Sequence, residues 1–154
     1  MSHIGPDSLY PDPKLTPGKA ETLKVDDLTD KWACKDGTHT VTCTYSQAHR
    51  DVRAHEHKDV YDEYKVPAPQ RNTKYGEVDH FYPLCAGGSN DLQNLWYQPA
   101  RSILNGTNFG YHQKDKLESF VCRQIKARKI DPAVAYKRIT EDWVKYYQEI
   151  FLKP

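Results

Sequence analysis

The sequence has no long apolar run and almost no excess of either charge. No segment approaches the ~18 apolar residues that a membrane-spanning helix needs, so no integral membrane segment is expected. The 154 residues include 22 Lys and Arg against 21 Asp and Glu, which gives a formal net charge of +1. A chain this close to neutral can bind nucleic acid only through a local basic patch, because its overall charge attracts no polyanion.

The cysteines lack the close pairing that structural zinc sites usually show. There are four, and no two form a CxxC pair: Cys34, Cys43, Cys85 and Cys122. Spread in this way they fit two disulfides in an exported protein or four free thiols in a cytosolic one. We favour disulfides and a secreted or periplasmic location, with the cytoplasm as the alternative. Four cysteines allow three pairings, and their spacing does not choose among them.

The N-terminus also lacks the apolar stretch of a signal peptide, as expected of a cytosolic protein or of one whose leader has been removed. Residues 1–24 instead hold four of the ten prolines. Proline fixes φ and removes a backbone donor, so we expect an extended N-terminal arm lying over the domain. The composition, 38% hydrophobic and 28% charged, indicates one globular domain, which we place at residues 25–154.

Hydrophobic spacing and turn residues predict a mixed α+β fold. Two short strands around a Gly-rich reversal are expected within residues 76–97, followed by a helix over residues 117–125. Asp131 is placed to cap a final helix that begins at Pro132. Earlier in the chain the pattern predicts a short helix at 26–32, a strand at 38–44, a helix at 46–64 with Ser46 as its N-cap, and a loop at 66–73.

The most informative segment reads EVDHFYPLCAGG from Glu77 to Gly88 and is followed by Asn94 in the triplet NLW. The carboxylate oxygens of Asp79 suit a hard divalent cation. The neighbouring imidazole of His80, with an ordinary pKa near ~6.5, can take a proton from water near neutral pH. The amide of Asn94 can hold the loop that orients both. An acidic residue, a histidine, a glycine turn and an asparagine are what a one-metal nuclease needs.

In this set of motifs the chain resembles the HNH endonuclease superfamily. It is most similar to small bacterial HNH proteins that read LTPG…C…E-x-DH-x-x-PL-x-x-GG…NLW-x-Q…KD-x-LE…VC…DW-x-x-Y. The matches run in order over about residues 15–147, and their order makes the resemblance specific. It implies a ββα-metal core at about residues 76–128, with additional helices and the N-terminal arm around it.

The resemblance implies a role for each matching residue. His80 matches the general base, Asp79 a metal ligand and Asn94 the residue that positions the base. One divalent cation is implied, Mg²⁺ first, with Mn²⁺, Ni²⁺ or Zn²⁺ as alternatives. Such a cation stabilises the charge that develops on the phosphate in the transition state. Glu77 is either a residue behind the metal ligands or a solvated strand residue.

The chain departs from the superfamily's pattern in the helix after the hairpin. The ending Cys-x-x-Cys-His-x-x-Lys is absent, and with it the frequent structural zinc. His112 is our preferred second metal ligand, because it is expected at the start of that helix. Asn108 and Asn105 are the alternatives. Asp115 and Glu118 could form a second metal site or a charge network, but we prefer that they cap the helix and pair with nearby basic residues.

Phosphate contacts are expected from Lys114, Arg101 and Lys116. Such contacts position nucleic acid without reading its sequence, so a salt-sensitive cut of low sequence specificity is predicted. The resembling proteins also carry cysteine at the positions of Cys34 and Cys122. The resemblance therefore suggests a bridge between these two, which leaves Cys43 to pair with Cys85.

The resulting hypothesis is a metal-dependent endonuclease that hydrolyses phosphodiester bonds in DNA, with RNA as the alternative substrate. One rival is a nuclease toxin or effector that acts on another cell and has an immunity protein as its partner. Another is a nuclease-like module that binds DNA without cutting it, and a third is a disulfide-stapled structural domain. No membrane partner is expected, and the sequence does not indicate an oligomeric state.

Overall fold

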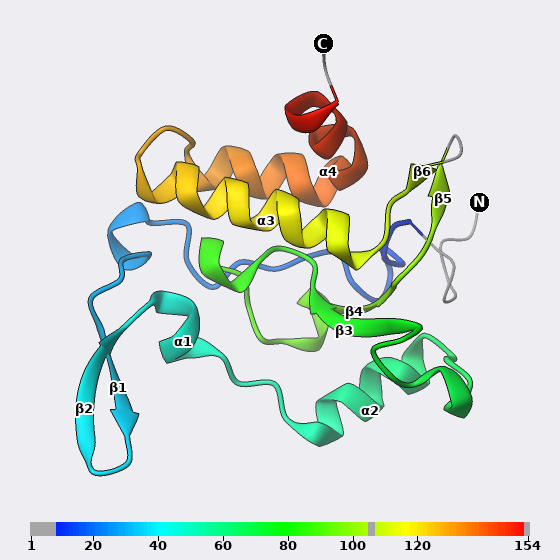
Figure 1. Ribbon diagram of the computed structural model, residues 1–154, viewed down its shortest axis with the longest axis horizontal. Coiled ribbons are helices and arrows are strands. Elements are labelled where there is room, and N and C mark those ends of the chain that lie inside the picture. The colour runs from blue at the N-terminus through cyan, green and yellow to red at the C-terminus, as the bar shows by residue number, and fades with distance from the viewer. Residues whose placement is uncertain (1–8, 105–106, 153–154) are drawn as a thin grey trace.

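Strand β3 (Gly76–His80) and strand β4 (Leu95–Pro99) form an antiparallel hairpin in the middle of the molecule. The computed structural model describes residues 9–104 and 107–152 and has an α+β fold (Figure 1). Every residue of β4 is buried, whereas the middle of β3 is half-buried. The two strands predicted within residues 76–97 are confirmed, and one side of β3 stays accessible to a ligand.

The other elements surround this hairpin. Two further antiparallel pairs occur in the described residues, β1 with β2 and β5 with β6. The remaining strands are β1 (Trp32–Asp36), β2 (His39–Cys43), β5 (Ile103–Leu104) and β6 (Thr107–Asn108). The helices are α1 (Tyr45–His49), α2 (Ala54–Glu63), α3 (Tyr111–Lys126) and α4 (Pro132–Phe151). Short 3₁₀ turns are η1 (Val25–Asp27), η2 (Ala68–Gln70), η3 (Leu84–Ala86) and η4 (Leu92–Asn94).

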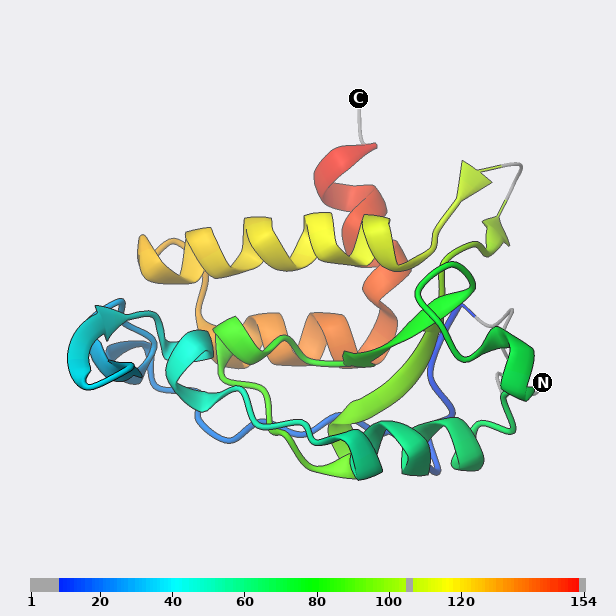
Figure 2. The same ribbon diagram turned by 60° about the horizontal axis from the view of Figure 1, so that its bottom comes forward.

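Helices cover the hairpin from two sides (Figure 2). Helix α3 and the first part of α4 run side by side above it, and α2 packs below it. The predicted helical stripe is confirmed, because Leu117, Val121 and Ile125 are all fully buried. They join Trp96 of β4 and Trp143 of α4 in one core. This packing fixes α3 over the hairpin.

Helix α4 begins as predicted and then bends. The Asp131 side chain accepts from the Ala133 amide at 2.8 Å, and Pro132 occupies the first helical position. At Asp142 the backbone leaves the helical region, with φ −165° and ψ 87°. The Asp142 carboxylate accepts from the Lys145 amide, so it acts as a second N-cap inside the helix. The last turns therefore point away from the first part, as Figure 1 shows.

The N-terminal segment lies against the core over residues 9–24. The Thr16 hydroxyl is fully buried and donates to the Leu95 carbonyl at 2.9 Å. The Trp143 indole N–H donates to the Leu9 carbonyl at 2.7 Å, and the Tyr10 hydroxyl donates to the Asp142 carboxylate. These contacts make the segment a strap across β4 and α4.

The helix predicted over residues 46–64 is wrong in its middle. Residues 50–53 are not helical and separate α1 from α2. The N-cap is Thr44 and not Ser46, because the Thr44 hydroxyl accepts from the Gln47 amide while the Gln47 side chain accepts from the Thr44 amide. Helix α1 ends where the side chain of Asn90 binds the His49 carbonyl. This tertiary contact competes with continuation of the helix.

The short helix predicted at 26–32 is also wrong. Only the 3₁₀ turn η1 forms there, and Trp32 is the first residue of β1. The Trp32 indole N–H donates to the Asp27 carbonyl, which holds the turn against the strand. The predicted strand at 38–44 is confirmed as β2. The predicted loop at 66–73 holds only the turn η2.

Two disulfides are present, but their pairing corrects the one that the resemblance suggested. Cys34 bonds to Cys43 and Cys85 bonds to Cys122. The first bridge is local because Cys34 and Cys43 lie on the paired strands β1 and β2, in a hairpin that projects away from α3 (Figure 1). That placement puts Cys34 out of reach of Cys122. The second bridge ties η3 to α3.

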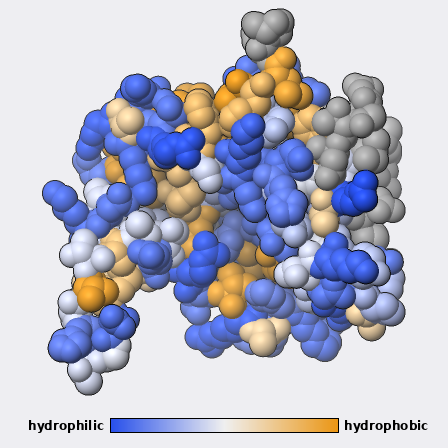
Figure 3. Space-filling view, in the orientation of Figure 1, coloured by the Kyte–Doolittle hydropathy of each residue, from blue (hydrophilic) through white to orange (hydrophobic). Residues whose placement is uncertain are grey.

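None of the helices in the described residues combines the length and the apolar character needed to cross a bilayer. In the view of Figure 3, hydrophilic side chains cover most of the face, and apolar side chains gather near the end of α4.

The two disulfides are expected to contribute unequally to stability. Replacing Cys85 and Cys122 by serine opens a loop with a sequence separation of 37, against 9 for Cys34 and Cys43. Loop-closure entropy predicts losses of about 4 and about 2.5 kcal/mol in the free energy of unfolding. Urea unfolding of the two double-serine variants checks this difference. Equal losses would show that chain entropy is not the dominant contribution.

Candidate functional site

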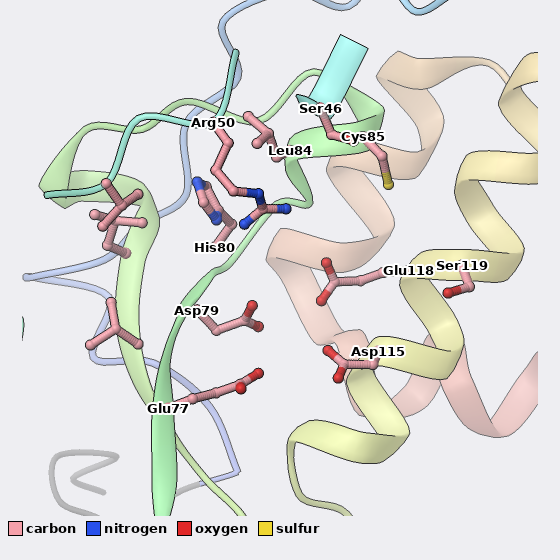
Figure 4. A pocket seen from close by; sticks show the side chains of 13 residues that line it. Ser46, Arg50, Glu77, Asp79, His80, Leu84, Cys85, Asp115, Glu118 and Ser119 are labelled. Atoms are coloured by element: carbon pink, nitrogen blue, oxygen red, sulfur yellow. The ribbon is translucent and has the colours of Figure 1, made fainter. Parts of the chain in front are cut away.

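A cavity of about 520 Å³ lies between β3, α3 and the segment after α1 (Figure 4). Its lining brings together ionisable residues that are far apart in the sequence. They are Glu77, Asp79 and His80 from β3, Asp115 and Glu118 from α3, and Arg50 from the connection between α1 and α2. Two of these, His80 and Asp79, are the residues that the sequence placed at the centre of the site.

The carboxylates come together because of the geometry of the two elements. Side chains two apart on a strand point to the same face, so Glu77 and Asp79 both point toward α3. On α3, Asp115 and Glu118 are three residues apart and share the facing side of the helix. Glu77, Asp79 and Asp115 each offer an oxygen, and these three atoms lie within 4.8 Å of one another. Such a group of oxygens suits a hard divalent cation.

Burial, and after it the crowding of like charges, raises the pKa values of Glu77, Asp115 and Glu118. Burial, followed by the charges of Asp79 and Asp115, raises the pKa of Glu77 to about 7. Burial and Asp79 likewise raise the pKa of Asp115 and of Glu118. The cluster therefore favours either bound protons or a bound cation, since like charges at this separation disfavour ionisation.

Lys114 occupies a structural position behind the cluster. Its ammonium group is fully buried and donates to the Asp79 carboxylate at 3.2 Å, the His80 carbonyl at 2.9 Å and the Glu118 carboxylate at 3.2 Å. Burial alone would lower its pKa, but Asp79 and Glu118 raise it above its ordinary value. All three donors are used, so the phosphate contact expected of Lys114 is corrected to a role in joining β3 to α3.

The tautomer of His80 follows from its contact with Asn90. The Asn90 NH₂ group donates to the His49 carbonyl at 2.6 Å, and a carbonyl can only accept. The amide oxygen of Asn90 is therefore the atom 3.0 Å from His80 Nε2, which must carry the hydrogen. In the neutral ring the lone pair is then on Nδ1, which makes no hydrogen bond within the described part of the chain. Burial lowers the pKa of His80, so this neutral form predominates near pH 7.

Asn94 holds the loop that connects the two strands. Its side chain is fully buried and makes four hydrogen bonds with backbone groups of Lys19, Tyr82 and Ser89. The loop packs tightly here, because a Cβ atom on Gly88 would lie 2.0 Å from the Tyr82 carbonyl oxygen. The Tyr82 contacts of Asn94 lie two residues after His80, so Asn94 is linked to His80 through the backbone.

Three other predicted residues, His112, Arg101 and Lys116, are not among those that line the cavity. His112 is exposed on the first turn of α3, with its ring 4.3 Å from that of Tyr111. Arg101 is exposed, and the Lys116 ammonium lies 4.4 Å from the ring centre of Phe151. Asn108 ends β6 and its side chain is not among those described, and Asn105 lies outside the described residues.

Two residues of the site, Arg50 and Asn90, were not predicted from the sequence, and Asp115 was expected mainly as a helix cap. Asp115 faces Glu77 and Asp79, Arg50 reaches the cavity from a break between helices, and Asn90 contacts His80. A signal existed only for Asp115, whose spacing from Glu118 puts two carboxylates on one helical face. The positions of Arg50 and Asn90 depend on tertiary contacts.

No protein-family model, curated protein or solved structure matches this chain. The chemistry of the site is therefore inferred from its own residues and their geometry.

The pKa of Glu77 predicts a pH-dependent stability for the protein without metal. A carboxyl with a folded-state pKa of about 7 keeps its proton where the unfolded chain, at ~4.3, has lost it. Its contribution is fully present below ~4.3 and is lost as the pH rises through about 7. Glu77→Gln should therefore raise the melting temperature in EDTA at pH 7.5 and change it little at pH 4.5. Thermal unfolding at both pH values tests this.

Comparing the melting temperature of Glu77→Gln with that of wild type at the same pH removes the effect of His80, which both proteins share. His80 affects stability in the opposite direction, because its pKa is lowered and its contribution to stability is lost as the pH falls through its folded-state pKa. Glu141→Gln, on an exposed residue of α4, is the control. If Glu77→Gln changes the melting temperature equally at the two pH values, the pKa of Glu77 is not raised in the folded protein.

The contact between Asn90 and His80 predicts that a substitution at Asn90 changes the pKa of His80. Asn90→Asp places a negative charge beside Nε2, which favours the imidazolium, so the pKa of His80 should rise. NMR titration of the His80 ring resonances measures the shift directly. His39, at the start of β2, serves as the internal reference in the same spectra. A His80 pKa unchanged in the variant would show that the ring does not depend on Asn90.

Proposed function

We propose that the protein is a metal-dependent endonuclease of the HNH type, with β3, β4 and α3 as its ββα-metal core. One observation carries this proposal: a neutral imidazole and three converging carboxylates share one cavity between that strand and that helix. The imidazole can serve as a base and the carboxylates can hold a cation. This combination suits phosphodiester hydrolysis, since a base and a cation are needed at the same phosphorus. A domain with only a structural role has no need for this costly arrangement of charge.

Glu77, Asp79 and Asp115 are the proposed ligands of one divalent cation. An all-oxygen set favours Mg²⁺ or Mn²⁺ over Zn²⁺ or Ni²⁺, which prefer sites that include nitrogen or sulfur. When bound, the cation polarises the phosphate and stabilises the charge of the transition state. Asp115 replaces His112 as the proposed ligand from the helix, because its carboxylate is the one that reaches the other two.

His80 is the proposed general base. Nδ1 takes a proton from water, the water oxygen bonds to phosphorus, and the bond from phosphorus to the 3′ oxygen breaks. The 3′ oxygen leaves with the electron pair of that bond and takes up a proton from solvent water. Asn90 keeps the hydrogen on Nε2, and Asn94 keeps the loop in place. The nearby charge of Asp79 favours the imidazolium that forms. These steps need a neutral His80 ring with its lone pair on Nδ1. The hydrogen bond to Asn90 sets that tautomer, and burial lowers the pKa of His80 so that the ring stays neutral.

DNA is the proposed substrate, with RNA as the alternative. The near-neutral net charge predicts weak, salt-sensitive binding and low sequence specificity. Two disulfides support a secreted or periplasmic location, where reducing systems do not open them. That location also fits the rival in which the nuclease acts on another cell. The available base on His80 argues against a module that binds DNA without cutting it.

His80→Ala is expected to remove cleavage while leaving the fold intact. The variant lacks the group that takes the proton from water, so the rate should fall about 10²-fold or more. Nicking of supercoiled plasmid with Mg²⁺ gives the rate, and EDTA should stop the wild-type enzyme. Circular dichroism confirms that the variant is folded. A wild-type protein that never cuts with any divalent cation would end the proposal.

The two candidate ligands from α3 give opposite expectations. Asp115→Asn should weaken Mn²⁺ binding about tenfold or more, whereas His112→Ala should leave it unchanged. Isothermal titration calorimetry at pH 7.5 measures both affinities without depending on activity. The reverse result would restore His112 as the ligand and remove Asp115.

A further inference from the structure

We propose that Arg50 is the phosphate-binding residue of this cavity. The proposal rests on the nuclease function above and adds to it the group that holds the substrate. The phosphate contacts predicted from the sequence do not supply that group. The Lys114 donors are occupied, and neither Arg101 nor Lys116 is among the residues that line the cavity.

The charge of the cavity requires a cation that remains with the protein. Its lining carries four carboxyl groups, and the buried Lys114 pairs with two of them. One divalent cation together with Lys114 does not offset four carboxylates and a phosphodiester. Among the described residues that line the cavity, Arg50 is the only lysine or arginine.

The guanidinium of Arg50 is available for a ligand. The residue is exposed, and within the described residues its side chain makes neither a hydrogen bond nor an ion pair. Other arginines nearby in the sequence are engaged: Arg53 pairs with Asp51 at 3.6 Å and Arg71 with Asp62 at 2.9 Å. A planar guanidinium matches two phosphate oxygens at once, which a lysine does not.

The position of Arg50 fits a phosphate held between the base and the metal ligands. Figure 4 shows its guanidinium beside the His80 ring, on the side of the cavity away from Glu77. A phosphate bound there lies within reach of a water that His80 activates. Its other oxygens face the carboxylate cluster, where the proposed cation binds.

One side chain ties this position to the base. Asn90 binds the His49 carbonyl, directly before Arg50, and also binds His80 Nε2. The Arg50 amide donates to the Ser46 carbonyl at 3.0 Å, which fixes the same segment to α1. The distance between base and phosphate-binding group is therefore set by a single amide and a short helix.

The substrate has room to continue past Arg50. A second cavity of about 570 Å³ adjoins the first and shares Arg50 and Leu84 with it. It is lined further by His49, Ser89 and Asn90, and by the carboxylates Glu21, Asp51 and Asp91. A phosphate at the junction of the two cavities therefore has acidic residues on both sides and meets Arg50 there.

Arg50→Ala and Arg50→Lys test the proposal, with Arg53→Ala as the control. Arg53 is exposed, lies three residues away and lines neither cavity. Binding of a fluorescein-labelled DNA duplex is measured by anisotropy in a His80→Ala background, so that cleavage does not interfere. Plasmid cleavage is measured with Mg²⁺ and otherwise native His80. Mn²⁺ affinity without DNA is measured by calorimetry.

Loss of Arg50 should weaken DNA binding about tenfold and lower kcat/KM about 10²-fold. The slope of log affinity against log salt should fall by about 0.9. Arg50→Lys should recover part of the binding, and Arg53→Ala should match wild type. Mn²⁺ affinity should stay the same or increase, because a positive charge leaves the cavity. A structural role for Arg50 would instead change thermal stability and leave the salt slope unaltered.

The outcomes separate this proposal from the function on which it rests. If wild type cuts DNA and Arg50→Ala cuts equally well, Arg50 is not the phosphate-binding residue and the nuclease stands. If wild type binds DNA through Arg50 but never cuts, the inference stands and the nuclease function falls. A wild type that neither binds nor cuts DNA overturns both.

Discussion

The buried ammonium group of Lys114 is the interaction on which the site depends. It joins β3 to α3 by bonding Asp79, the His80 carbonyl and Glu118 at once. Burying a charge costs several kcal/mol unless partners replace its lost hydration, and here two carboxylates and a carbonyl do so. Removing Lys114 would leave both carboxylates uncompensated in a buried position. The disulfide between Cys85 and α3 holds the same interface from the other end of the helix.

That interaction also explains why the cavity carries an excess of negative charge. One lysine compensates Asp79 and Glu118 in part, and Glu77 and Asp115 then crowd the same space. Without a bound cation, Glu77 keeps its proton up to a pKa of about 7. The protein therefore loses stability as the pH rises and this carboxyl ionises. The proposed divalent cation would relieve this repulsion, and a bound phosphate would then need positive charge from Arg50. In the proposed function, stability, metal binding and substrate binding are therefore coupled through one group of carboxylates.

The parts of the fold that local sequence determines could be predicted, and the parts set by tertiary contacts could not. The hairpin at 76–97 and the cap at Asp131 are local, because a glycine turn and a capping side chain act within a few residues. The break after His49 depends on Asn90, and the bend at Asp142 accompanies a bond from Tyr10, both distant in sequence. Spacing alone also left the cysteine pairing open among three arrangements.

The inward position of Lys114 determines which other side chains of α3 face the carboxylates of β3. Successive residues of an α-helix turn by about 100°, so His112 points about 160° away from Lys114. Asp115 lies about 100° from Lys114 and Glu118 about 40°, on the side that faces β3. With Lys114 pointing inward, His112 lies on the far side of the helix from it, about 60° beyond Asp115. The three carboxylate oxygens that converge are those of Glu77, Asp79 and Asp115, which is why Asp115 rather than His112 is the proposed ligand from α3.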